Sequence, residues 1–192
     1  LCVQHPFIQL CCPSVRGSAT GKLLVTSDYL HIIWRLRVQF LRPERRLVFA
    51  GLVISHSIIV SLHRSLPTDQ KDLGLRYHDL DHHDKQHYEG ALRLFDFSMD
   101  RKTGVVTAGN RIRDALSKDA CHMGTRMFLE FAHRYVAVFV VRDRDLRDII
   151  RDCGFCLAFI AHWRKWLTES PLANCKMNFL TEETRVDVIV SL

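Results

Sequence analysis

A short polar segment from Tyr77 to Glu89 concentrates the residue types that could do chemistry. It holds four histidines and four acidic residues within thirteen positions. Histidines four residues apart share one face of a helix, so two such pairs could each grip a metal ion beside a nearby aspartate. No cysteine or distant ligand motif completes a zinc spacing, so we predict no metal site and interpret the segment as the polar, partly exposed start of a helix. The weak candidates for metal ligands are His78, His82, His83 and His87.

A Cys-x-x-Cys sequence at Cys153 and Cys156 has the spacing of the dithiol in thioredoxin-like proteins. In those proteins a helix N-terminus lowers the pKa of the first thiol. Here the pair falls inside a helical pattern with no βαβ unit around it, so we predict buried thiols without redox chemistry. The seven cysteines of the chain are irregularly spaced, which predicts free thiols in a reducing, intracellular compartment.

The segment from Gly17 to Lys22 is similar in composition to a phosphate-binding loop. It is one residue short between its glycines, and Leu23 stands where a magnesium-binding serine or threonine is needed. We therefore predict a turn.

The composition is that of an ordinary globular protein with an excess of arginine. The chain has 192 residues, of which 47% are apolar and 25% charged, and this suits one domain or a piece of a larger protein. Its formal charge is +6 and its pI about 9.1, and arginine outnumbers lysine by 20 to 7. Because guanidinium binds phosphate and carboxylate bidentately, the charge favours acidic partners. A salt-bridged surface is the alternative, since 21 acidic residues are interspersed.

Turn and capping residues divide the first part of the chain. Residues 1–26 form an irregular segment, in which we consider a short strand near the end. Ser27 and Asp28 make a fair N-cap for a helix over 29–41, which Pro43 ends. Pro43 then sits in the first turn of a second helix that reaches about residue 66.

The apolar part of this second helix, Leu47 to Leu62, raises a membrane alternative. It is 16 residues long and contains Gly51, Ser55, His56 and Ser57. A bilayer needs about 20 apolar residues, so we predict a buried helix and no membrane partner.

The rest of the chain is patterned for helices. A helix is predicted over 84–97 and a polar loop over 101–110. One apolar stripe comprises Met123, Met127, Phe131, Tyr135 and Val138, and a second comprises Leu146, Ile149, Cys153, Phe159 or Ile160, Trp163 and Leu167. Ser170 closes the second of these helices, and Thr181 caps a last one.

The predicted fold class is mainly α, a helical bundle, with a small remnant of an α/β core at the N-terminus as the one addition considered. The domain boundaries that we expect are an irregular segment over 1–26 and a helical domain over 27–192, which ends within an apolar pattern.

Four short stretches together carry a resemblance to a known family. The first stretch joins His5-Pro6 and Arg16-Gly17-Ser18-Ala19 to Gly21-Lys22-Leu23-Leu24, and the second joins Asp84-Lys85-Gln86 to Ala91-Leu92-Arg93-Leu94-Phe95. The third runs from Phe159-Ile160 to Trp166-Leu167, and the fourth is Phe179-Leu180-Thr181-Glu182-Glu183-Thr184. These stretches resemble the C-terminal half of P-element/THAP-type DNA transposases, in particular transposon-derived proteins of fungi.

The resemblance implies a ribonuclease-H-like core interrupted by a helical insertion. In that family carboxylates bind two magnesium ions for cleavage and transfer of DNA strands, and the insertion of the P-element type also binds a guanine nucleotide. In this chain the family's acidic positions fall on His5 and Thr168, and its asparagine on Arg164. Neither His5 nor Thr168 can offer magnesium a carboxylate. We therefore expect no catalysis and no cofactor.

The predicted function is that of a transposase-derived, basic helical protein that contacts DNA without cutting it, in the nucleus if the resemblance holds. A solvated basic face without DNA binding is the alternative for the charged residues that precede and enter the Met123 helix. The competing function is a helical scaffold that binds other protein chains and no nucleic acid. The candidates for contacts with DNA phosphates are Arg111, Arg113, Lys118 and Arg126.

Overall fold

Eight α-helices and one small β-hairpin make up the part of the chain that the computed structural model describes, which is residues 28–65, 75–81, 83, 88–96, 108–141, 143–171 and 173–192. The predicted mainly α fold is confirmed. The N-terminal segment, in which a strand and a turn were predicted, lies outside the described residues.

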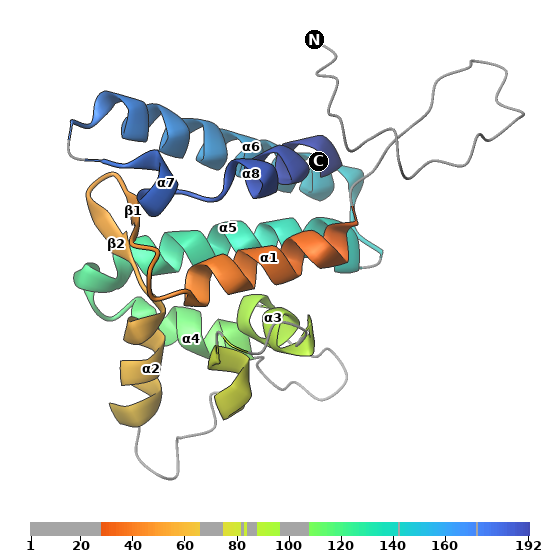
Figure 1. The fold of residues 1–192 in the computed structure, drawn as a ribbon. Coiled ribbons are helices and arrows are strands. Elements are labelled where there is room, and N and C mark those ends of the chain that lie inside the picture. Colours follow the sequence, from red (N-terminus) through yellow and green to blue (C-terminus); the bar gives the residue numbers. More distant parts are fainter. Residues whose placement is uncertain are drawn as a thin grey trace, which may run out of the picture.

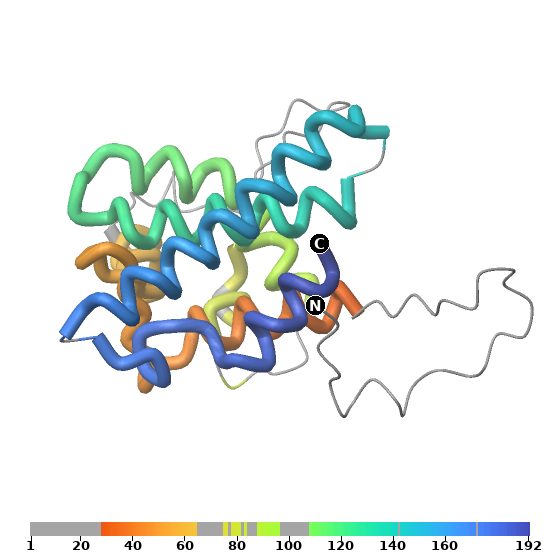
Figure 2. Tube along the Cα trace, turned by 90° about the horizontal axis from the view of Figure 1, so that it is seen from above, coloured from red at the N-terminus to blue at the C-terminus, as the bar shows by residue number. Residues whose placement is uncertain are grey.

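Helix α5 (Met123–Val140) is the central helix of the bundle and lies beside α1 (Tyr29–Leu41) (Figure 1). A layer of three helices covers this pair: α6 (Leu146–Glu169), the short α7 (Cys175–Asn178) and α8 (Glu182–Ser191). Viewed from above, α6 runs obliquely across α5, and α8 follows α1 (Figure 2).

The opposite side of the central pair is covered by shorter elements. These are α2 (His56–Ser65), α3 (Tyr88–Phe95) and α4 (Ala108–Leu116), with two 3-10 helices, η2 (Tyr77–Leu80) and η3 (Ala120–His122). Both α3 and α4 contact α5, and η2 packs against α3 (Figure 1).

Two helices begin where their capping residues predict. The Asp28 carboxylate accepts a hydrogen bond from the Leu30 N–H at 2.9 Å, and the Thr181 hydroxyl accepts one from the Thr184 N–H at 3.3 Å. These bonds satisfy N–H groups that have no partner within the helix. The predicted bounds of the 29–41 helix and the predicted cap at Thr181 are confirmed.

A β-hairpin replaces the first half of the helix predicted from 43 to 66. Strand β1 (Leu47–Phe49) pairs antiparallel with β2 (Leu52–Ile54), and α2 begins only after them. Ala50 and Gly51 form the two-residue turn with φ of 50° and 79°, the left-handed pair that such hairpins require. The prediction was wrong because a short apolar run does not by itself distinguish a helix from a strand. Among the described residues, no helix combines the length and the apolar character needed to cross a bilayer.

Several helix limits also differ from those predicted. Helix α3 ends at Phe95, two residues before the predicted end. Helix α4 begins at Ala108, inside the predicted loop over 101–110, whose first seven residues lie outside the described part of the chain. The short α7 was not predicted.

The core is rich in aromatic rings. Trp163 is fully buried, as predicted, and its indole N–H donates to the Val48 carbonyl at 2.7 Å, which ties α6 to the hairpin. Phe128 stacks on Phe40 with ring centroids 5.2 Å apart. The predicted apolar stripes are wrong in the first turns, because Met123 is 39% exposed and Leu146 68%. In the first turn of α5 the buried residues are instead Gly124 and Thr125, which lie against β2, and in α6 the first buried residue is Asp152.

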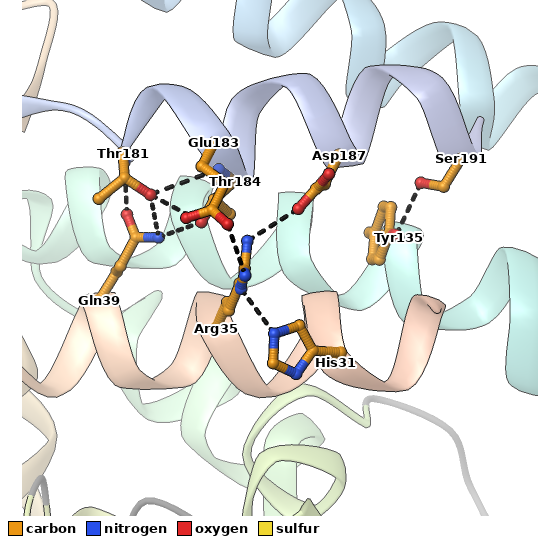
Figure 3. A network of polar contacts seen from close by, with 9 residues as sticks. All are labelled: His31, Arg35, Gln39, Tyr135, Thr181, Glu183, Thr184, Asp187 and Ser191. Carbon is orange, nitrogen blue, oxygen red and sulfur yellow. Dashed lines mark hydrogen bonds and ion pairs between the residues drawn. The ribbon is translucent and has the colours of Figure 1, made fainter. Parts of the chain in front are cut away.

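Helix α8 is fastened to α1 by a row of polar contacts (Figure 3). The Arg35 guanidinium donates to the Asp187 carboxylate at 2.8 Å. The Gln39 side chain donates to the hydroxyls of Thr181 and Thr184, and its carbonyl oxygen accepts the Thr181 N–H at 2.8 Å. This ladder orients the start of α8 on α1.

Gly124→Ala should lower the free energy of unfolding by about 1 to 3 kcal/mol. A Cβ at position 124 would lie 2.5 Å from the Val53 carbonyl oxygen and 2.9 Å from Cβ of Leu52, so β2 would have to move away from α5. Urea denaturation of the wild type and the variant measures the loss.

Gly154→Ala is the matched control, because nothing lies within 4 Å of a Cβ at this position. Alanine is the better helix former by about 1 kcal/mol, so this variant should be at least as stable as the wild type. Equal stability of the two glycine variants would contradict the tight contact between α5 and β2.

Candidate functional site

Buried Arg37 of α1 holds the polar segment in place. Its Nε donates to the Asp79 carbonyl at 3.0 Å, and its Nη2 donates to the carbonyls of His78 at 3.0 Å and Asp81 at 3.1 Å. A buried guanidinium must keep its donors satisfied, so the backbone of η2 wraps around it. The interpretation of this part as the exposed start of a helix was wrong, since residues 77–80 form a separate 3-10 helix ahead of α3.

The Asp79 carboxylate anchors the same segment from its other side. It is fully buried and accepts two hydrogen bonds from the Arg93 guanidinium, at 2.7 and 2.9 Å. It also accepts the Arg76 N–H at 2.7 Å. The bond to Asp79 is the main cause that raises the pKa of Arg93. We name these contacts of Arg37 and Asp79 the clamp.

The histidines of the segment do not form a metal site in the described part of the chain. His78 and His83 are exposed, whereas His82 and His87 lie outside the described residues. Among the residues described, no three His, Cys, Asp or Glu side chains are placed to hold a metal ion together.

A cavity of about 540 Å³ lies between α2 and the clamped segment. Helix α2 lines it with three residues at positions i, i+3 and i+4, which share one face of a helix. The Asp81 carboxylate accepts the His83 N–H at 2.9 Å, so these two lining residues are fixed relative to each other. The lining residues are Val60, His63, Arg64, Arg76, Leu80, Asp81 and His83.

The four cations predicted to bind DNA phosphates are distributed over α4, the connection that follows it and the start of α5. Arg111 and Arg113 lie on α4, and Arg113 donates to the Asn110 side chain at 2.5 Å. Lys118 and Arg126 flank η3, which contacts β2. Two of the four therefore lie at the end of the bundle that carries the hairpin, which we name the hairpin end.

A second group of cations meets at the hairpin end and was not predicted. The Arg45 guanidinium donates to the Phe179 carbonyl at 2.7 Å, and the Arg164 guanidinium lies 5.8 Å from the centre of the Phe179 ring. These contacts bring the segment after α1 to the end of α6 and to α7 (Figures 1 and 2). We name the group the cationic ridge. Besides Arg45 and Arg164 we include the exposed cations of the same segments, which are Arg42 and Arg46 beside Arg45, and Lys176 on α7, three positions before Phe179.

The charges of the ridge repel one another. The pKa of Arg45 is lowered, first by burial and second by the positive charge of Arg42. Arg42, Arg46 and Lys176 are exposed, and Glu44 is the one acidic residue within segment 42–46.

The Cys-x-x-Cys pair lacks the environment of a reactive dithiol. Burial is the main cause that raises the pKa of both Cys153 and Cys156, and the charge of Asp152 raises them further. The thiolates are therefore disfavoured. Of the two thiols predicted to be buried, Cys156 is buried and Cys153 is partly exposed. The four described cysteines are free, as predicted.

The positions that match the magnesium ligands of the transposase family do not fit the metal. Thr168 is exposed, and its hydroxyl donates to the Lys165 carbonyl at 2.7 Å within α6. A hydroxyl that is engaged with its own helix is a poor substitute for a carboxylate. His5 lies outside the described residues.

Comparison of the chain with known protein families, with curated proteins and with solved structures gives no match. The resemblance to transposases rests on the four short stretches and stays a prediction.

Arg37→Gln should lower the free energy of unfolding by about 3 kcal/mol or more, because the buried carbonyls of η2 lose their donors. Arg35→Gln is the matched change on the other face of α1. There the guanidinium is partly exposed and bonds to Glu183 and Asp187, so the expected loss is about 1 kcal/mol. Thermal unfolding compares the two variants. Similar losses would contradict the clamp as the main anchor of the segment.

Acid should destabilise the protein in part through His133 of α5. Its Nδ1 lies 3.0 Å from the Phe95 carbonyl oxygen, and burial lowers its pKa from the ordinary 6.5. Below that pH the unfolded chain binds the proton and the folded chain resists it, so the free energy of unfolding falls as the pH falls. His133→Asn keeps a donor but does not titrate. Urea midpoints at pH 7 and pH 5 should differ less for this variant than for the wild type.

Proposed function

We propose that this protein is a non-catalytic helical module that binds the phosphate backbone of nucleic acids through the cationic ridge. The single observation that carries the proposal is the convergence of Arg45 and Arg164 on Phe179. That contact brings cations from two distant parts of the sequence to one place.

Two arginines of the ridge differ in their partners from several other arginines of the fold. Arg35, Arg93 and Arg134 each bond to carboxylates, which neutralise their charge. Arg45 contacts a carbonyl and Arg164 a ring, which orient a guanidinium without cancelling its charge. Glu182 is an acidic residue whose charge interacts with that of Arg164. Burial and, second, the positive charge of Arg42 lower the pKa of Arg45, and a bound polyanion would relieve the repulsion between these two arginines. A surface of this kind favours the binding of an acidic, extended partner.

Nucleic acid fits this chemistry better than an acidic protein patch does. Guanidinium binds phosphate oxygens bidentately, and a phosphate backbone presents charges in a continuous row. Lys118 and Arg126, two of the cations predicted from the sequence, lie at the same end and would extend the contact beyond the hairpin. A transposase origin agrees with this function and is part of the proposal.

Arg42→Gln/Arg46→Gln should weaken binding to a short DNA duplex. With two phosphate contacts removed, the slope of log affinity against log salt should become shallower by about two. Fluorescence anisotropy of a labelled duplex at about 50 to 200 mM salt measures this slope.

Arg147→Gln/Arg151→Gln is the matched control. Both residues are exposed at the start of α6, at the other end of the bundle, and this variant should keep the slope of the wild type. Lys118→Gln/Arg126→Gln tests the extension of the surface. If this last variant loses more duplex affinity than the ridge variant does, the binding site lies at the α4–α5 connection. If the ridge variant and the control variant change the affinity equally, the proposal is overturned.

The competing function, a protein–protein scaffold, has one observation in its favour. Leu146 and Ile150, both more than 60% exposed, lie with Leu157 along the outer side of α6. If the wild type fails to bind a duplex at low salt and self-associates in a manner that Ile150→Asp abolishes, the scaffold is the better account.

A further inference from the structure

We propose that the cavity between α2 and the clamped segment binds a small organic oxyanion, a phosphate monoester or a carboxylate with an apolar body. This site is separate from the cationic ridge and does not depend on the nucleic-acid proposal. The inference rests on the cavity, on the charge of its lining and on the rigidity of one wall.

The lining combines positive charge with apolar surface. Among the described lining residues, Arg64 and Arg76 contribute two guanidinium groups and the histidines two imidazoles, against one carboxylate, that of Asp81. That carboxylate already accepts the His83 N–H, which reduces its effect on an incoming anion. Val60 and Leu80 supply the apolar surface. A ligand with an anionic head and an apolar body matches both parts.

The wall opposite α2 is organised before any ligand arrives. The Arg76 N–H is fixed by the buried Asp79 carboxylate, and the carbonyl of Asp81 is fixed by Arg37. Leu80 lies between these two anchored positions. Because the clamp holds this backbone, binding does not have to pay the entropy of ordering it.

The volume suits a small molecule. Sites for small ligands commonly enclose about 300 to 1,000 Å³ and place a few polar groups within an apolar lining. The cavity of about 540 Å³ falls in this range. Arginines can bind a phosphate or a carboxylate bidentately, so the head group is an oxyanion of either kind.

Phenyl phosphate is the probe that tests the site, with phenol and benzoate titrated in parallel. Two-dimensional amide NMR should show shifts at Val60, Leu80 and His83 with phenyl phosphate, with benzoate or with both, and none with phenol. The oxyanion that shifts these residues identifies the head group. Absence of shifts with both anions, or equal shifts with phenol, would overturn the proposal.

Arg64→Gln/Arg76→Gln should weaken binding of the responding anion about tenfold or more, the effect of losing charged hydrogen bonds. Both arginines are exposed, so the variant is expected to fold. Val60→Phe fills the cavity without changing charge and should also abolish binding.

Arg42→Gln/Arg46→Gln, which alters the cationic ridge, should bind the probe as the wild type does. If this variant fails to bind the probe, the probe binds at the ridge and the cavity proposal is overturned. Duplex binding is measured in a separate experiment, so the two proposals can fail independently. If the Arg64/Arg76 variant or Val60→Phe binds the probe with wild-type affinity, the cavity proposal is also overturned.

Discussion

The side of the bundle that carries η2 and α3 depends on one constraint, the buried guanidinium of Arg37. A charged group can leave water only if the protein replaces its hydration, and here three backbone carbonyls do so. Those carbonyls belong to a segment that is too short to form a helix of normal length. The segment therefore owes its shape to α1, more than thirty residues earlier. Asp79 completes the arrangement by joining η2 to α3 through Arg93.

This dependence explains which parts of the fold can be predicted from sequence. The limits of α1 and the cap of α8 follow from residues within a few positions of the helix ends, Asp28, Pro43 and Thr181, and the structure agrees with them. The hairpin depends on left-handed backbone at Ala50, a residue type that rarely signals such a turn. The first turns of α5 and α6 were assigned the wrong buried face, because periodicity indicates a face but not whether a neighbour reaches it.

The same reasoning explains which residues of the candidate sites could be predicted from the sequence and which could not. The polar segment was recognised from its density of ionisable residues, yet the partner that buries its backbone, Arg37, has no local signal. The ridge was missed because Arg45 and Arg164 meet only through Phe179, over one hundred positions from Arg45. Clusters along a sequence are easy to detect, whereas clusters that form by folding require the tertiary contacts.

The two proposed sites have different structural requirements, and different parts of the fold meet them. A phosphate backbone is long and regularly charged, so it needs exposed cations spread over a surface, and local rigidity matters little to it. A small anion offers few contacts, and its binding therefore depends on groups that are already in place. The ridge lies where α1, α6 and α7 end and leaves most of its cations in solvent. The cavity lies where the clamp fixes backbone on one side and a helix face stands on the other. Because Arg37 is on the buried face of α1 and Arg42 just beyond the helix end, one helix supports both sites without sharing a side chain between them.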